Sequence, residues 1–261
     1  MKNLREIDTF LLDMDGTIYL GDRLFDCTLP FLHLLLRQKK RYIFLTNNSS
    51  RNKTAYLEKL ARLGVPVEED SVFTSGEATT IYLNAQKPGA RVFLCGTPSL
   101  EAEFAGAGFV LTDDTPDYAV LGFDQTLTYE KLVKLCGFVR AGIPFIATHP
   151  DFNCPVEGGF IPDVGAMLAL VRASTGREPD YIVGKPNRGI IDALARKYAL
   201  QLSHMAMVGD RLYTDIAVGV NAGITSILVL SGESTKEDLA ASPVKPSYVF
   251  ADLSGILEAI R

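Results

Sequence analysis

Short apolar runs recur along the chain, and small or polar residues follow most of them. The runs cover residues 10–12, 42–45, 92–94, 118–121, 144–147, 181–183, 205–208, 226–230 and 248–250. Apolar residues with helical spacing occur between several of these runs, at residues 31–38, 53–63, 129–141 and 190–198. Alternation of buried strands with amphipathic helices is typical of a doubly wound parallel sheet. We therefore predict an α/β protein with a Rossmann-like core.

Two breaks interrupt this alternation and suggest that one domain is inserted into another. The segments Lys87–Ala90 and Thr175–Asp180 are rich in Gly, Pro and polar residues, and a second series of strands and helices lies between them. We expect residues 78–180 to form a smaller α/β cap domain with its own sheet. Residues 1–77 and 181–261 would then combine into one discontinuous core domain.

Composition narrows the classes of protein that fit. The chain has 261 residues, 47% hydrophobic and 22% charged, as ordinary folded proteins have. Its net charge of −5 provides no basic field for a nucleic-acid backbone. The four cysteines form no Cys-x-x-Cys pair, which argues against a zinc site or a disulfide framework. No apolar run approaches the roughly 18 residues that a membrane span needs, and the first residues lack the features of a signal peptide. We expect a cytoplasmic protein.

The first apolar run ends in two acids, Asp13 and Asp15, followed by Gly16. A buried parallel strand would deliver both carboxylates to the carboxyl edge of the sheet, where α/β proteins bind ligands. Two carboxylates this close repel each other unless a cation or a shared proton holds them. A simple turn is the alternative, since Asp and Gly are turn formers.

The second apolar run leads into the polar sequence Thr46-Asn47-Asn48-Ser49-Ser50. Hydroxyl and amide side chains together with backbone N–H groups at a helix start can cradle a phosphate. Alternatively, Asn48 or Ser49 caps the following helix.

Lys185 follows a later run, in the sequence Gly184-Lys185-Pro186. The sequence is not a P-loop, because Pro186 replaces the required Ser or Thr and no glycine lies five residues before Gly184. Lys185 could be solvated, or it could offset nearby carboxylates and contact a phosphate as a point charge.

Two more acids, Asp210 and Asp215, follow the run at residues 205–208. Asp210 at a strand end can bind a hard cation through oxygen. Asp215 would fall in the first turn of the next helix, where a negative charge is favourable in any case. An EF-hand starting at Asp13 is excluded, because Gly16 occupies loop position 4 rather than 6. Together, the four strand ends predict a magnesium–phosphate site.

These motifs resemble those of a known family. Asp13–Thr17, Thr46–Asn48, Lys185 and Gly209–Asp215 are similar to the four ordered motifs of the haloacid dehalogenase superfamily of phosphatases. The large insertion between the second and third motifs resembles its NagD-like, p-nitrophenyl phosphatase subgroup (subfamily IIA), as does Thr74-Ser75-Gly76-Glu77. The resemblance covers essentially the whole chain.

The resemblance implies roles for the acids. Asp13 would be the nucleophile that forms an aspartyl-phosphate, and Asp15 would be the general acid and then the general base. Mg²⁺ would be held by the carboxylates of Asp13 and Asp210 and by the backbone carbonyl of Asp15. Asp215 would orient the metal shell or pair with Lys185.

The resemblance also implies how phosphate is held. Thr46 and the backbone amide of Asn47, with Asn48 nearby, would bind the phosphoryl oxygens. Lys185 would steady both the nucleophile and the phosphate. The inserted domain would close over the site and select the leaving group.

Two segments of the insertion depart from the subgroup pattern. In Thr148-His149-Pro150-Asp151, His149 replaces an expected Asn, and Pro162-Asp163-Val164-Gly165 departs from Pro-Gly-x-Gly. We name His149 and Asp151 as candidate substrate contacts. His149 could also supply a pH-sensitive donor or be a structural turn residue.

The leading hypothesis is a magnesium-dependent hydrolase of small phosphomonoesters such as a sugar phosphate, with p-nitrophenyl phosphate as an artificial substrate. A phosphotransferase or phosphomutase would use the same intermediate but needs an acceptor better than water. A metal-dependent nucleotide-sugar-binding protein or glycosyltransferase would leave Lys185 and Asp215 unexplained. A regulatory role would keep the phosphate site without catalysis. The expected partner is a small molecule, and a cap of this size can support a homodimer.

Overall fold

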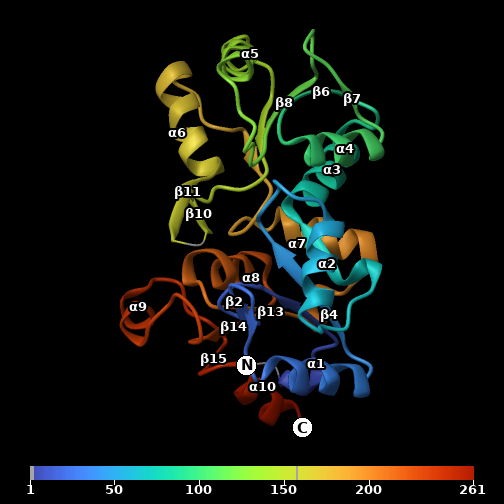
Figure 1. Cartoon of the computed structure of the whole chain (residues 1–261), viewed down its shortest axis with the longest axis vertical. Coiled ribbons are helices and arrows are strands. Elements are labelled where there is room, and N and C mark those ends of the chain that lie inside the picture. Colours follow the sequence, from blue (N-terminus) through green and yellow to red (C-terminus); the bar gives the residue numbers. More distant parts are fainter. Residues whose placement is uncertain (1–2, 157) are drawn as a thin grey trace. The chain divides into compact units, whose positions relative to one another are not determined.

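The computed structural model describes residues 3–156 and 158–261 (Figure 1). The strands in chain order are β1 (Thr9–Leu12), β2 (Tyr19–Leu20), β3 (Arg23–Leu24), β4 (Arg41–Thr46), β5 (Val72–Thr74), β6 (Arg91–Cys95), β7 (Val110–Leu111), β8 (Tyr118–Leu121), β9 (Phe145–Ala147), β10 (Asn153–Val156), β11 (Gly159–Pro162), β12 (Tyr181–Ile182), β13 (Met205–Gly209), β14 (Thr225–Val229) and β15 (Tyr248–Phe250).

The α-helices in chain order are α1 (Thr28–Arg37), α2 (Lys53–Arg62), α3 (Ser75–Gln86), α4 (Pro98–Gly106), α5 (Tyr129–Arg140), α6 (Val164–Thr175), α7 (Gly189–Tyr198), α8 (Ala217–Ala222), α9 (Lys236–Ala241) and α10 (Leu253–Ile260). A π-helical segment, η4 (Leu212–Ile216), precedes α8. Within residues 3–156 and 158–261, no helix combines the length and the apolar character that a membrane crossing requires.

The chain divides into two compact units. The first contains residues 3–46, Lys53–Phe73 and Lys185–Arg261, and the second contains Asn47–Asn52 and Thr74–Gly184. The short segment Asn47–Asn52, called here the 47–52 segment, therefore belongs to the second unit although it follows β4 directly in the chain.

The first unit is built on a six-stranded sheet in the order β15-β14-β13-β1-β4-β5. β1 pairs in parallel with both β13 and β4, so the strand order changes direction beside β1, at the position where doubly wound sheets bind ligands. Phe10 of β1 meets Phe31 of α1 edge to face, with ring centroids 5.8 Å apart. Residues of α1 and α10 share this buried apolar cluster, so these helices cover one face of the sheet.

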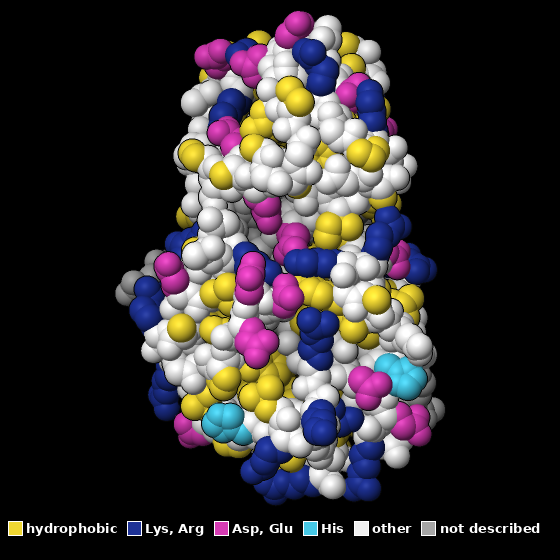
Figure 2. Space-filling view, turned by 90° about the vertical axis from the view of Figure 1, so that its right-hand side faces the viewer, with side chains coloured by type: hydrophobic (Ala, Val, Ile, Leu, Met, Phe, Trp, Pro, Cys, Tyr) yellow, Lys and Arg dark blue, Asp and Glu magenta, His cyan; other side chains and the backbone are white. Residues whose placement is uncertain are grey.

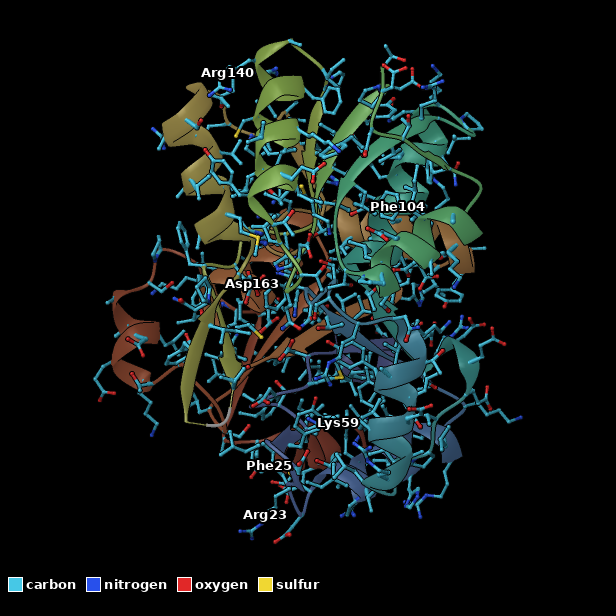
Figure 3. All side chains as sticks on the ribbon, turned by 45° about the horizontal axis from the view of Figure 1, so that its top comes forward. Arg23, Phe25, Lys59, Phe104, Arg140 and Asp163 are labelled. Atoms are coloured by element: carbon cyan, nitrogen blue, oxygen red, sulfur yellow. The ribbon has the colours of Figure 1, made fainter. Side chains whose placement is uncertain are left out.

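The second unit has its own parallel sheet, in the order β12-β9-β8-β6-β7. Apolar residues of β6, β8 and β9 pack against α5 and α6, and the β10–β11 hairpin joins β9 to α6. Figure 3 labels Phe104 on α4, Arg140 at the end of α5 and Asp163 just before α6.

The fold class predicted from the apolar pattern is confirmed, and each apolar run beyond residue 40 corresponds to a strand within one or two residues. The second compact unit extends to Gly184, whereas the expected boundary is at residue 180. Tyr181 and Ile182 form β12, which pairs with Ile146 and Ala147 of β9 and so belongs to the second sheet. At the other junction, α3 lies wholly in the second unit, a few residues before the expected start at residue 78.

On the face shown in Figure 2, acidic and basic side chains both occur among uncharged ones, and several Lys and Arg side chains gather at its lower end.

Candidate active site

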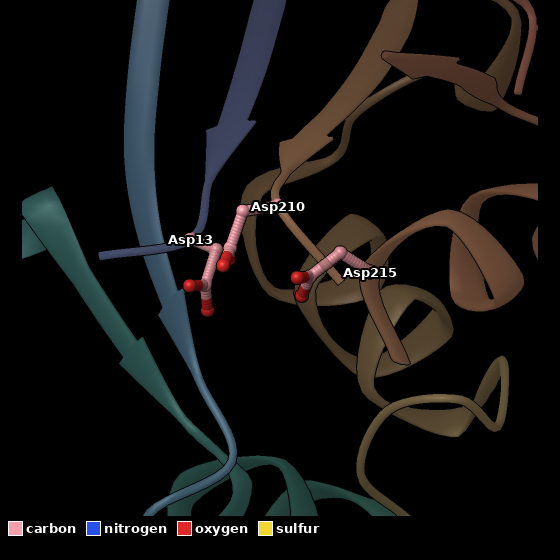
Figure 4. Close-up of side chains that lie close together, drawn as sticks. All are labelled: Asp13, Asp210 and Asp215. Carbon is pink, nitrogen blue, oxygen red and sulfur yellow. The ribbon is translucent and has the colours of Figure 1, made fainter. Parts of the chain in front are cut away.

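Three carboxylates, those of Asp13, Asp210 and Asp215, converge in the first unit (Figure 4). Each offers an oxygen within 4.8 Å of the others. Asp13 follows β1 and Asp210 follows β13, and these neighbouring parallel strands end at the same edge. The backbone N–H of Asp13 donates to the carbonyl of Val208, 2.9 Å away, which continues the pairing to the acid itself.

Asp215 lies in η4 and not in a regular α-helical turn. π-Helical segments inside helices occur frequently at functional sites. The side chain is fully buried, and its Oδ2 accepts a hydrogen bond from the backbone N–H of Arg211 at 3.2 Å. The segment thus turns a carboxylate inward, towards the end of β13.

Lys185 joins the carboxylates into one ionic cluster. Its Nζ lies 2.6 Å from Asp13 Oδ1 and 2.7 Å from Asp215 Oδ1, and it also donates to the carbonyl of Leu45 at 3.3 Å. Burial by itself lowers the pKa of Lys185, but the adjacent charges of Asp13 and Asp215 raise that pKa above its ordinary value. Lys185 therefore remains an ammonium group, and the solvated alternative does not hold.

Asp210 is held so that one of its oxygens remains available. Its Oδ2 accepts from the backbone N–H of Glu233 at 2.7 Å, and a Cβ on Gly16 would lie 2.4 Å from the same oxygen. Its Oδ1 is buried and has no hydrogen-bond partner among the described residues. Burial and the charge of Asp13 raise the pKa of Asp210. A hard cation fits this donor set, because it would satisfy the oxygen and relieve the repulsion.

Asp15 lies beside this cluster and is only partly buried. Burial raises its pKa, Lys59 of α2 (labelled in Figure 3) opposes the rise, and Asp13 adds to it.

The predicted phosphate-binding residues lie at the end of β4. Thr46 is the last residue of β4 and is buried. In the second unit, the Nδ2 of Asn47 lies 3.1 Å from both carboxylate oxygens of Asp151. Asn48 Oδ1 accepts from the backbone N–H and the hydroxyl of Ser50, at 2.9 and 2.8 Å. The Asn48 side chain therefore closes a turn within the 47–52 segment rather than capping α2, which begins at Lys53.

His149 is fully buried, which does not fit a direct contact with substrate. Its Nε2 lies 2.9 Å from Asp163 Oδ1, and its Nδ1 lies 3.0 Å from Thr148 Oγ1. Both ring nitrogens of His149 therefore face protein groups. Asp151, by contrast, is only partly buried and contacts Asn47.

Two contributors to these sites do not follow from the motif pattern. The hydroxyl of Ser75 donates to the backbone carbonyl of Asn47, although the Thr74-Ser75-Gly76-Glu77 phrase did point to this region. In the sequence, Asp163 is only a departure from the Pro-Gly-x-Gly pattern, and its partner His149 is fourteen residues away.

Comparisons with known proteins identify the family. Residues 10–110 match the haloacid dehalogenase-like hydrolases, and residues 182–256 match a second segment described as HAD-hydrolase-like. The acid sugar phosphatase of Staphylococcus epidermidis is 37% identical over 252 residues, which are 96% of this chain and 97% of that protein.

Solved structures of similar proteins point to the same family. A 4-nitrophenylphosphatase from Thermotoga maritima is 48% identical, with a TM-score of 0.96 and full coverage of both chains. A glycerol phosphate phosphatase from Mycobacterium tuberculosis, solved in complex with magnesium, is 32% identical with a TM-score of 0.89, over 97% of this chain and 78% of that one. The chain therefore belongs to the haloacid dehalogenase-like hydrolase family, in its NagD-like, p-nitrophenyl phosphatase subgroup, and is a phosphatase.

Proposed function

We propose that the protein hydrolyses small phosphomonoesters through a covalent aspartyl-phosphate on Asp13, with Mg²⁺ as cofactor. The observation that carries this proposal is the contact of Lys185 with both Asp13 and Asp215, next to the unpartnered Oδ1 of Asp210. One ammonium group beside three carboxylates leaves excess negative charge, because the nearby Arg211 guanidinium is itself paired with Glu233. A site for a phosphate needs a further cation to offset that charge.

Asp13 acts as the nucleophile. The Lys185 ammonium lies 2.6 Å from Asp13 Oδ1 and fixes the orientation of that carboxylate. A carboxylate oxygen of Asp13 attacks phosphorus, the ester P–O bond breaks, and Asp15 gives its proton to the leaving oxygen. Asp15 then takes a proton from water, whose oxygen attacks phosphorus and breaks the bond to Asp13. Phosphate is released and both acids return to their starting forms.

The residues that would hold Mg²⁺ are the carboxylates of Asp13 and Asp210 and the backbone carbonyl of Asp15. Asp215 would not bind the cation directly, because its two oxygens already accept from Lys185 and from the backbone N–H of Arg211. It would instead orient the groups around the cation. When bound, the cation supplies charge neutralisation for the phosphoryl oxygens.

We further propose that Thr46, the backbone amide of Asn47 and Asn48 bind the phosphoryl oxygens, and that the second unit is a cap that selects the leaving group. The name of the staphylococcal relatives favours sugar phosphates as the substrate class. Asp151, which is partly exposed in the second unit, is the candidate contact for a substrate hydroxyl.

The test is turnover of p-nitrophenyl phosphate and of a panel of sugar phosphates, with and without Mg²⁺, by the wild type and by Asp13→Asn. We expect the substitution to lower kcat by at least about 10³-fold, because the nucleophile is lost. Asp8→Asn serves as the matched control, since Asp8 is an exposed acid of the same unit. Near-normal turnover by Asp13→Asn would contradict the mechanism, and transfer of phosphate to an added alcohol in preference to water would favour a phosphotransferase.

A further inference from the structure

The 47–52 segment is held by buried hydrogen bonds from the second unit. The carbonyl of Asn47 accepts from the Ser75 hydroxyl at the start of α3. The carbonyl of Ser50 accepts from Thr97 Oγ1 at 2.9 Å, just after β6. These bonds fix the segment by its backbone, at both ends of its polar sequence.

A longer chain of hydrogen bonds reaches the middle of the segment. Ser49 Oγ accepts from the backbone N–H of Phe123 at 2.9 Å and lies 3.0 Å from Thr148 Oγ1. Thr148 Oγ1 in turn lies 3.0 Å from Nδ1 of His149. Ser49, Thr148 and His149 are essentially inaccessible to solvent, so water cannot replace a lost partner and each loss leaves an unsatisfied polar group.

Asp163 sets the direction of this chain. A carboxylate only accepts hydrogen bonds, so the contact of Asp163 Oδ1 with Nε2 places the ring proton on Nε2. In the neutral imidazole, Nδ1 is then an acceptor for the Thr148 hydroxyl. The Thr148 oxygen is left to accept from Ser49. The same Asp163 oxygen accepts from the backbone N–H of Val164 at 2.6 Å, which anchors the pair to the start of α6.

Gly184 packs against both ends of this chain. A Cβ on Gly184 would lie 2.7 Å from Asn47 Oδ1 and 2.8 Å from His149 Cβ. Asn47 and His149 therefore both pack closely around the Gly184 backbone. In such close packing, a movement of the imidazole is expected to displace the 47–52 segment as well.

We propose that His149 is a positioning residue for phosphate binding: oriented by Asp163, its Nδ1 holds Thr148 and Ser49 and so fixes the 47–52 segment. This role rests on the proposed function, because it assumes that Asn47 and Asn48 bind the phosphoryl group. The histidine thus acts through the phosphate-binding segment and does not touch the substrate.

Two substitutions distinguish the contributions of the two ring nitrogens of His149. His149→Asn keeps an acceptor near the position of Nδ1, whereas His149→Gln keeps a donor near the position of Nε2 and loses Nδ1. We expect His149→Gln to raise both the KM for p-nitrophenyl phosphate and the inhibition constant of inorganic phosphate about tenfold, with kcat changed by less than about threefold. His149→Asn should change both constants by less than about threefold, even where it lowers Tm by leaving Asp163 without its partner.

Thr148→Val provides an independent test, because it removes the linking hydroxyl at nearly constant shape. Thr148→Val should raise both the KM for p-nitrophenyl phosphate and the inhibition constant of inorganic phosphate. The double variant with His149→Gln should raise them little further, because both substitutions break the same chain of hydrogen bonds. His204→Gln is the matched control. His204 lies 2.8 Å from Asp8 in an exposed His–Asp pair of the first unit, so its loss should leave KM unchanged.

The outcomes are distinguishable. If the wild type neither hydrolyses p-nitrophenyl phosphate nor binds inorganic phosphate, the proposed function fails and the role of His149 fails with it. The wild type could instead be active while Thr148→Val and the folded His149 variants keep the wild-type KM and phosphate inhibition constant. His149 would then be only structural, and the positioning proposal alone would be overturned. A greater loss of phosphate binding in His149→Asn than in His149→Gln would also overturn it.

Discussion

Each unit buries a cluster of polar side chains, and the two clusters differ in how far their own groups satisfy one another. In the first unit, three carboxylates surround the ammonium group of Lys185, and the buried Oδ1 of Asp210 has no partner among the described residues. In the second unit, the chain from Ser49 to Asp163 pairs each donor with an acceptor.

The unsatisfied cluster of the first unit needs a ligand to balance it. The satisfied chain of the second unit needs none and can only support a neighbouring ligand site. A cluster with excess charge and an unpaired oxygen is costly until a cation binds. A closed chain in which each polar group has a partner gains nothing from a ligand and instead makes its surroundings rigid. The comparison therefore assigns chemistry to the first cluster and positioning to the second.

Removal of the central ammonium should have the largest effect on stability. In EDTA, Lys185→Met is expected to lower the free energy of unfolding by about 3–5 kcal/mol, because it leaves buried carboxylates uncompensated. Urea unfolding measures this. Lys134→Met, which breaks an exposed i,i+4 pair with Glu130, should lower the free energy of unfolding far less. Equal losses in the two variants would show that the Lys185 cluster is effectively solvated.

Mg²⁺ should stabilise the protein through the carboxylate cluster of the first unit and not through the hydrogen-bonded chain of the second. At about 100 times its Kd, the cation should add about 2.7 kcal/mol to the free energy of unfolding. Thermal unfolding in EDTA and in Mg²⁺ measures the shift. Asp210→Asn should abolish most of it, whereas Asp163→Asn should retain it. A Mg²⁺ shift that survives in Asp210→Asn would place the cation elsewhere.

The smallest effect is expected from opening the closed chain without removing a charge. Thr148→Val should lower the free energy of unfolding by about 1–3 kcal/mol, the cost of unsatisfied buried partners. This loss should be the same with and without Mg²⁺. A loss that depends on Mg²⁺ would mean that the two clusters are energetically one.

Elements with a strong apolar period are predictable from the sequence, and those that bury small polar residues are not. α5 and α7 follow directly from their apolar spacing. α3 gives no such signal, because its buried positions include Ser75, Gly76 and Thr79. β12 is only two residues long, and its membership of the second sheet depends on its pairing with β9.

The candidate site shows the same division. Asp13 and Asp210 each follow an apolar run, and the neighbouring parallel strands β1 and β13 bring both to one edge, so their meeting is predictable. The contact of Lys185 with Asp13 is not, because the apolar run before Lys185 forms β12 of the second sheet. The environment of His149 is not, because it depends on which buried groups lie opposite each ring nitrogen.

The sequence by itself determined the α/β fold class and the four strand ends that carry the acids, the lysine and the Thr–Asn segment. These follow from local periodicity and from the chemistry of residue types. Only the tertiary structure decided that the 47–52 segment belongs with the second unit and that His149 points to Asp163. Buried hydrogen bonds join residues far apart in the chain, and no local pattern encodes their partners.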